Sequence, residues 1–129
     1  MIVLDASAAV EWLLRTPRGR LVDAHVAADP LLAAPHLIDA EVAAVLHRAA
    51  LAGALSEPRA LQALDDWAVA PFHRYPHPPM LAQVWRQRHN TSAYDAFYAV
   101  LAQTLDATLL TGDQRLARAL AGTTRLQVV

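Results

Sequence analysis

Four acidic residues stand where a parallel α/β sheet would carry its chemistry. Asp5 directly follows the apolar run Ile2–Leu4, and Asp113 comes just after a second apolar run. Glu41 lies near the start of a long predicted helix, and Asp95 lies in the first turn of another. Open parallel sheets bind ligands at the carboxyl ends of their strands. We therefore expect the four carboxylates to meet at one edge of the sheet.

Four carboxylates in one place repel one another unless cations neutralise them. The chain contains no lysine, so hard divalent cations with oxygen ligands, Mg²⁺ or Mn²⁺, are the counter-charge that we expect. One or two such ions can orient and deprotonate a water for attack on a phosphodiester, and can stabilise the leaving oxygen. The acids therefore predict a metal site suited to phosphodiester cleavage.

Three of the four acids also have a purely structural alternative. Asp113 could cap the helix that follows it, and Ser92 and Asp95 have the spacing of a capping box. Glu41 could be a solvated helix residue. Asp5 has no comparable role, because a carboxylate buried after a strand is costly unless it is paired. The interpretation as a site depends on the four acids together.

Short apolar strands that alternate with helices predict an α/β domain with a mainly parallel sheet of about four to five strands. The predicted strands are Ile2–Leu4, 31–34, Phe72–Tyr75, Thr108–Thr111 and 126–129. Helices are predicted at 7–14 with Ser7 as N-cap, at 21–28 after a loop with Pro17 and Gly19, at 37–52, from Pro58, at 80–89, from Thr91 or Ser92 to Leu105, and at Gln114–Leu120. No repeat or linker divides the chain, so residues 1–129 are expected to form a single domain.

Composition limits the class of protein further. Hydrophobic residues make up 55% of the chain, more than a domain of this size can bury, which predicts an apolar interface with a partner or a second copy. The absence of cysteine excludes disulfides and thiolate metal sites. No signal peptide and no apolar run of membrane-spanning length is present. A cytoplasmic protein that does not contact membranes is expected.

Several segments resemble a known family. They are Ile2-Val-Leu-Asp-Ala-Ser7, an acidic residue in the helix after Pro35, Thr91-Ser-Ala-Tyr-Asp-Ala-Phe-Tyr-Ala-Val-Leu-Ala102 and Leu109-Leu-Thr-Gly-Asp113. Together, and in this order, they resemble the PIN domain, in particular the VapC-type toxins of type II toxin–antitoxin systems. The resemblance covers essentially the whole chain, and it implies a three-layer α/β/α fold.

The resemblance also implies an activity and partners. It implies an endoribonuclease dependent on Mg²⁺ or Mn²⁺ that cuts structured RNA such as tRNA or rRNA loops. It further implies a homodimer that a small VapB-like antitoxin inhibits by inserting into the active-site groove. The alternative within the same fold is a non-catalytic PIN-like module that binds RNA or protein.

The family's site residues can be carried over position by position. The acidic residues, catalytic and metal-binding in the family, match Asp5, Glu41, Asp95 and Asp113. Ser7 and Thr111 match its hydroxyl positions, which would orient carboxylates or water, although a helix cap and a strand end are the structural alternatives. Ala44 departs from the pattern, because many relatives have asparagine there. Asp39 is the one nearby acid that competes with Glu41 for its role.

Other features point less clearly to function. Phosphotransfer domains of the receiver or haloacid dehalogenase type also place an aspartate after the first strand, but both need a lysine that this chain lacks. His73 and His77 stand four residues apart, but they straddle a proline-rich loop, so the i, i+4 geometry of a helical zinc site does not apply to them. Six basic side chains are candidates either for contacts with RNA phosphates or for an ordinary charged surface: Arg15, Arg18, Arg86, Arg88, His89 and Arg115.

Overall fold

Five short strands form one parallel sheet in the order β3-β2-β1-β4-β5. The computed structural model describes residues 1–129, and its strands are β1 (Ile2–Leu4), β2 (Leu32–Pro35), β3 (Phe72–Tyr75), β4 (Thr108–Thr111) and β5 (Leu126–Val128). The three central strands are almost entirely buried, whereas the edge strands β3 and β5 are partly exposed. Apolar runs without alternation suit central strands of this kind, because both of their faces are covered.

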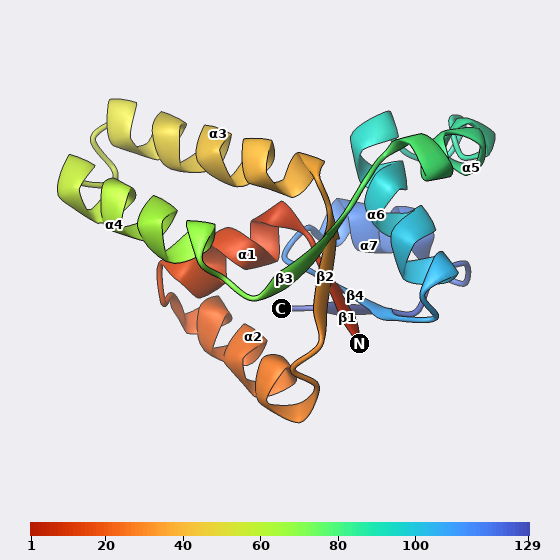
Figure 1. The fold of residues 1–129 in the computed structure, drawn as a ribbon, viewed down its shortest axis with the longest axis horizontal. Coiled ribbons are helices and arrows are strands. Elements are labelled where there is room, and N and C mark those ends of the chain that lie inside the picture. The colour runs from red at the N-terminus through yellow and green to blue at the C-terminus, as the bar shows by residue number, and fades with distance from the viewer.

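Helices cover both faces of the sheet (Figure 1). They are α1 (Ala6–Leu13), α2 (Pro17–Ala28), α3 (Leu37–Leu51), α4 (Glu57–Ala68), the short 3₁₀ helix η1 (Pro78–Met80), α5 (Leu81–Arg86), α6 (Ala93–Thr104) and α7 (Gln114–Leu120). Helices α1 to α4 lie on one side and α5 and α6 on the other, while α7 packs on β4 and β5. This arrangement confirms the predicted three-layer α/β/α fold.

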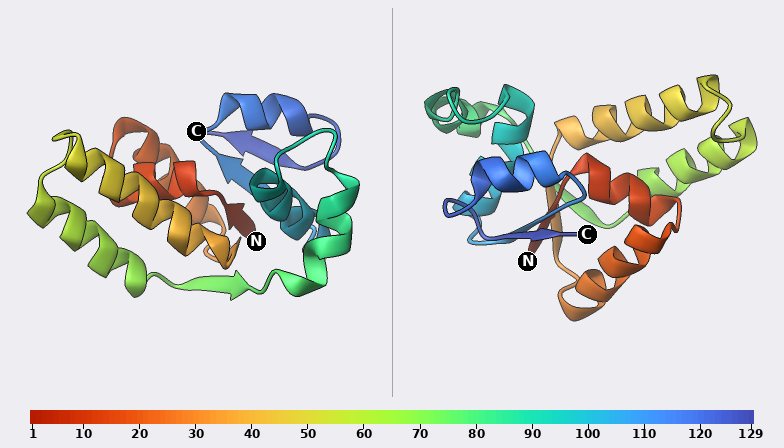
Figure 2. Two further views of the ribbon diagram at one scale, coloured as in Figure 1. Left: turned by 90° about the horizontal axis from the view of Figure 1, so that it is seen from above. Right: turned by 180° about the vertical axis from the view of Figure 1, so that it is seen from behind.

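Two helices give the molecule its elongated outline. Figure 2 shows α3 and α4 as an antiparallel pair that extends well beyond the sheet. On the opposite face, α6 packs directly on β1, β2 and β4, and its segment 98–102 is buried throughout. The carboxyl ends of β1 and β4 therefore lie between the start of α3 and the start of α6.

No helix of the chain is both long enough and apolar enough to cross a membrane.

The prediction of a loop at Pro17 and Gly19 is wrong, because both residues lie inside α2. Thr16 caps this helix by accepting a hydrogen bond from the Gly19 N–H at 3.0 Å. Proline is favoured at the first position of a helix, where its missing N–H costs nothing. Glycine is required two residues later, because a Cβ on Gly19 would overlap the carbonyl oxygen of Glu11 in α1. The glycine therefore marks a close crossing of two helices.

Other boundaries also differ from the prediction. Asp5, not Ser7, is the N-cap of α1, and Ser7 lies within the first turn. Strand β2 begins one residue later than predicted and includes Pro35, which pairs with Tyr75 of the edge strand. The helix predicted at 80–89 ends at Arg86, so residues 87–92 form the connection to α6.

Candidate active site

The four acids named from the sequence line a single pocket at the carboxyl edge of the sheet. The pocket has a volume of about 280 Å³. Each acid comes from a different place in the fold: Asp5 from the end of β1, Glu41 from α3, Asp95 from α6, and Asp113 from the turn between β4 and α7. Ser7, Ala44, Arg48 and Tyr98 are among the other lining residues. The topology therefore brings together residues that are far apart in the sequence.

Asp5 is the most buried of the four carboxylates and is held by three donors. Its Oδ1 accepts hydrogen bonds from the Ala8 N–H at 2.9 Å and from the Ser7 hydroxyl at 2.7 Å. Its Oδ2 accepts a hydrogen bond from the Thr111 hydroxyl. Asp5 is only 5% exposed, and this burial raises the pKa of its carboxyl against the opposing effect of the three donors. The nearby charge of Asp113 raises this pKa further.

The hydroxyls of Ser7 and Thr111 connect Asp5 to the turn after β4. Ser7 Oγ accepts a hydrogen bond from the Gly112 N–H at 2.8 Å, and Thr111 Oγ1 accepts one from the Asp113 N–H at 2.9 Å. Each hydroxyl therefore donates to one carboxylate oxygen and accepts from the backbone beside the other acid. A side chain at position 112 would crowd Ser7, because an added Cβ would lie 3.2 Å from its Oγ.

Glu41 is oriented by a tyrosine from the opposite helical layer. The Tyr98 hydroxyl of α6 donates a hydrogen bond to Glu41 Oε2 at 2.5 Å. Burial raises the pKa of Glu41, and the charges of Asp5 and Asp95 add to the effect. The pKa of the Tyr98 phenol is raised far above its ordinary value, first by burial and then by its bond to Glu41. Tyr98 therefore remains a donor at neutral pH.

Asp39 is committed elsewhere and does not line the pocket. Both of its carboxylate oxygens lie 3.0 Å from the Arg74 Nε, and Oδ1 also accepts a hydrogen bond from the Trp67 indole at 2.8 Å. This acid connects α3 to α4 and β3. Of the two acids that compete at the start of α3, only Glu41 faces the other carboxylates.

Asp95 and Asp113 differ in how far capping explains them. Ser92 caps α6 by accepting from the Asp95 N–H at 3.1 Å, but no backbone N–H returns a bond to the Asp95 carboxylate. The capping-box alternative is therefore wrong for that side chain. Asp113 does cap α7, since its Oδ1 accepts from the N–H groups of Arg115 and Leu116 at 2.7 and 3.2 Å. Capping leaves its Oδ2 without a hydrogen bond.

Sequence reasoning missed two polar residues of the pocket, Tyr98 and Arg48. Arg48 is the only cation among the lining residues, and none of the chain's ion pairs involves it. Helical spacing contains a signal for both residues. Tyr98 lies one turn after Asp95, and Arg48 lies two turns after Glu41 on the face that also carries Ala44. Ala44 lines the pocket, so the departure from the family pattern falls within the site.

The donor set fits a hard divalent cation. All four acidic side chains offer oxygen ligands, which Mg²⁺ and Mn²⁺ prefer. Burial raises the pKa values of Asp5 and Glu41, neighbouring carboxylates raise them further, and a cation beside these acids would oppose both effects. No group of three or more His, Cys, Asp or Glu side chains is arranged to hold one ion. Mg²⁺, however, often binds only one or two carboxylates directly and keeps several waters.

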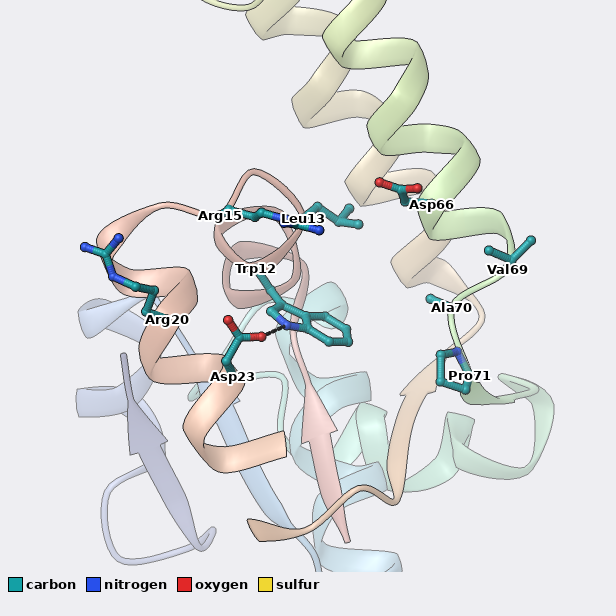
Figure 3. A pocket seen from close by; sticks show the side chains of 9 residues that line it. All are labelled: Trp12, Leu13, Arg15, Arg20, Asp23, Asp66, Val69, Ala70 and Pro71. Carbon is teal, nitrogen blue, oxygen red and sulfur yellow. Dashed lines mark hydrogen bonds between the residues drawn. The ribbon is translucent and has the colours of Figure 1, made fainter. Parts of the chain in front are cut away.

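A larger hollow of the molecule lies elsewhere (Figure 3). It has a volume of about 680 Å³, and its lining residues come from α1, α2, α4 and the segment before β3. Trp12 projects into it, with its indole N–H donating to Asp23 Oδ1 at 2.6 Å. Trp12 stands near the end of α1, whereas Asp5 caps the start of this helix. None of the four carboxylates lines this hollow.

Comparison with known proteins identifies relatives of the whole chain. The model of the PIN domain matches residues 2–121. Ribonuclease VapC1 of Mycobacterium tuberculosis is 44% identical over 118 residues, which are 91% of this chain and 89% of the relative. VapC ribonuclease Mb0985 of Mycobacterium bovis is 40% identical over 91% of this chain and 89% of that protein. The crystal structure of PAE2754 from Pyrobaculum aerophilum superposes with a TM-score of 0.75 and 26% identity, and covers 98% of this chain and 83% of the other. The chain belongs to the PIN domain family.

Proposed function

We propose that this protein is a Mg²⁺- or Mn²⁺-dependent endoribonuclease and the toxin of a toxin–antitoxin pair. The observation that carries the proposal is the single pocket lined by Asp5, Glu41, Asp95 and Asp113. The relatives that are named as VapC ribonucleases support the same activity. A non-catalytic binding module would have no use for four carboxylates in one pocket, two of which have pKa values raised by burial and, to a lesser extent, by neighbouring carboxylates.

Carboxylates of this pocket would hold the metal, which when bound would activate water for attack on the phosphodiester and stabilise the leaving oxygen. The other residues of the pocket prepare these acids for that task. Ser7 and Thr111 fix both oxygens of Asp5, and Tyr98 fixes Glu41. Orienting groups of this kind commonly change metal affinity or activity by about 10–100-fold. The free guanidinium of Arg48 is placed to attract the phosphate.

The proposed partners are RNA such as tRNA or rRNA, a VapB-like antitoxin and a second copy of the chain, and the proposed location is the cytoplasm. The resemblance to VapC-type toxins is the main support for these partners. An exposed apolar surface is consistent with the two protein partners, since Leu51 and Leu61 are 78% and 61% exposed. They line a groove of about 660 Å³ between α3 and α4, most of whose lining is apolar. Apolar surface of this kind commonly marks a protein interface.

The activity is tested with purified protein freed of antitoxin by unfolding and refolding. We expect cleavage of labelled total RNA when Mg²⁺ or Mn²⁺ is present, none in EDTA, and recovery when excess metal is restored. Cleavage that continues in EDTA at the same rate would contradict the metal-dependent mechanism. RNA binding without any cleavage at saturating metal would instead support the non-catalytic module.

Metal binding can be tested apart from catalysis by thermal unfolding. We expect Mg²⁺ or Mn²⁺ to stabilise the wild type, by about 3 kcal/mol when the ion concentration is about 100 times its Kd. The melting temperature should therefore rise by several degrees. The double variant Asp5→Asn, Asp95→Asn should show no such rise, because it has lost two of the four charges. An equal rise in both proteins would place the ions elsewhere.

A further inference from the structure

A second cleft adjoins the carboxylate pocket and has the opposite electrical character. Its volume is about 340 Å³, and its lining includes Arg88, His89, Thr91 and Arg115. Asp95 is the only acid of this cleft, and it also lines the carboxylate pocket. The two hollows therefore meet at this side chain.

The walls of the two hollows are continuous as well. Arg115 follows Asp113 by two residues, so the first turn of α7 presents an acid to one hollow and a cation to the other. On the opposite wall, the connection from α5 supplies Arg88, and α6 begins immediately beyond it with its N-terminus at the cleft. A polynucleotide with one phosphate at the carboxylates could therefore place a neighbouring phosphate in this cleft.

The cations of the cleft are not neutralised within the protein. Neither Arg88 nor Arg115 takes part in an ion pair. Arg88 is nevertheless held in place, because its Nη1 donates to the Trp85 carbonyl at 3.1 Å and its guanidinium lies 4.5 Å from the centre of the Trp85 ring. Guanidinium groups that are ordered before binding lose less entropy when they contact a phosphate.

Thr91 supplies a further unsatisfied group on this cleft. Its hydroxyl oxygen is buried without any hydrogen-bond partner, and it is the only buried side-chain polar atom of the chain in this state. Buried polar groups are nearly always satisfied in folded proteins, so an exception needs an explanation. An anion that entered the cleft beside the start of α6 could accept the missing hydrogen bond.

We propose that this cleft binds the backbone phosphate of a nucleotide that flanks the scissile bond, with Arg88 and Arg115 as its principal contacts. The inference rests on the proposed function for the class of ligand, since a polynucleotide is the ligand that carries regularly spaced phosphates past the carboxylates. Arg88 and Arg115 would position the RNA and take no part in the reaction itself.

RNA binding without metal tests the cleft independently of catalysis. A fluorescent single-stranded RNA of mixed sequence is titrated with wild type and variants in EDTA at several salt concentrations. Arg88→Ala and Arg115→Ala should each raise the Kd about tenfold, as expected for loss of a charge-assisted hydrogen bond. Each should also reduce the slope of log Kd against log salt by about 0.7. Arg88 and Arg115 are both exposed, so the two variants should melt like the wild type.

The chain offers matched controls on the same two helices. Arg86 of α5 lines a different hollow, and Arg118 of α7 lies one turn beyond Arg115 and outside the cleft. Arg86→Ala and Arg118→Ala should change the Kd less than about twofold, as surface charges outside a binding site do. If all four variants weaken binding equally, the effect is one of general charge and the proposed site is overturned.

Two further outcomes separate this inference from the proposed function. Wild type that fails to cleave RNA with metal, but shows the expected binding pattern, would refute the nuclease and retain the phosphate site. Active enzyme with an unchanged Kd and KM in Arg88→Ala and Arg115→Ala would retain the nuclease and overturn the site. The site would also be overturned if these variants lost affinity for a copurified acidic protein while binding RNA normally.

Discussion

The variant Asp5→Asn is expected to cleave RNA about 10³-fold or more slowly than the wild type. A bound metal contributes several kcal/mol of charge stabilisation in the transition state, and each 1.36 kcal/mol changes the rate about tenfold. Asparagine keeps the oxygen that caps α1, so the hydrogen bond from Ala8 to position 5 can persist. The loss should therefore be one of charge, measured as kcat/KM at saturating metal.

The same variant should be as stable as the wild type or more stable when metal is absent. Burial raises the pKa of Asp5 in the folded protein, so the ionised carboxylate lowers the free energy of unfolding at neutral pH. This cost disappears below the ordinary pKa of an aspartate, where Asp5 is protonated, and grows as the pH rises from there through the raised folded value. Asparagine stands in for the protonated form.

Urea unfolding in EDTA checks the sign of this effect. The stability difference between Asp5→Asn and wild type should be greatest at neutral pH and should shrink as the pH is lowered toward the ordinary range of carboxyl groups. Asp65→Asn is a suitable control, because Asp65 is a residue of α4 outside the pocket. Full cleavage activity in Asp5→Asn would refute the assigned role of the carboxylate.

Glu41→Gln should also reduce cleavage strongly, by about 10²- to 10³-fold, by the same argument about charge. Glutamine has the same size and retains an oxygen that can accept from Tyr98. The neighbouring Asp39→Asn should change activity less than about twofold, because Asp39 contacts Arg74 and Trp67 and not the pocket. Its expected effect is on stability.

Asp39→Asn and Glu41→Gln should therefore have opposite effects on stability and activity. Asp39→Asn weakens a partly exposed ion pair, so the free energy of unfolding should fall by less than about 1 kcal/mol. Glu41→Gln should melt at an equal or higher temperature in EDTA, since it removes a carboxylate whose pKa is raised by burial. Kinetics and melting of both proteins check the assignment. If Asp39→Asn were the inactive variant, the acid of α3 would have been assigned wrongly.

Much of the fold could be predicted because apolar runs have definite ends. The bounds of β1, β3 and β4 were predicted as the structure has them. In β1 and β4 the apolar run ends at Asp5 and shortly before Asp113, which also made these acids recognisable as strand-end residues. Pro17 could not be interpreted so directly, because proline favours both loops and the first turn of a helix. The capping of α2 by Thr16 and the close crossing at Gly19 decide between these, and the crossing depends on tertiary structure.

The site was predictable in its acids but not in its supporting contacts. Spacing places Tyr98 on the face of α6 that carries Asp95, but it cannot show that this face meets Glu41 of α3, which is 57 residues away. Likewise, a serine in the first turn of a helix has several ordinary roles. The bond from Ser7 to Asp5 is local, but only the approach of the turn after β4 lets Ser7 also accept from the Gly112 N–H.

The hydrogen bonds across β1 and β4 have a consequence for synthesis of the protein. Asp5 emerges from the ribosome early, but its Oδ2 partner Thr111 lies 106 residues later in the chain. The backbone N–H of Gly112, which donates to Ser7, is separated from Ser7 by a similar length of chain. A nascent chain therefore carries its first acid long before that acid can be oriented. Under the proposed function, we expect such a chain to remain inactive beside the ribosomal RNA until the segment with Thr111 has been translated and β4 has paired with β1.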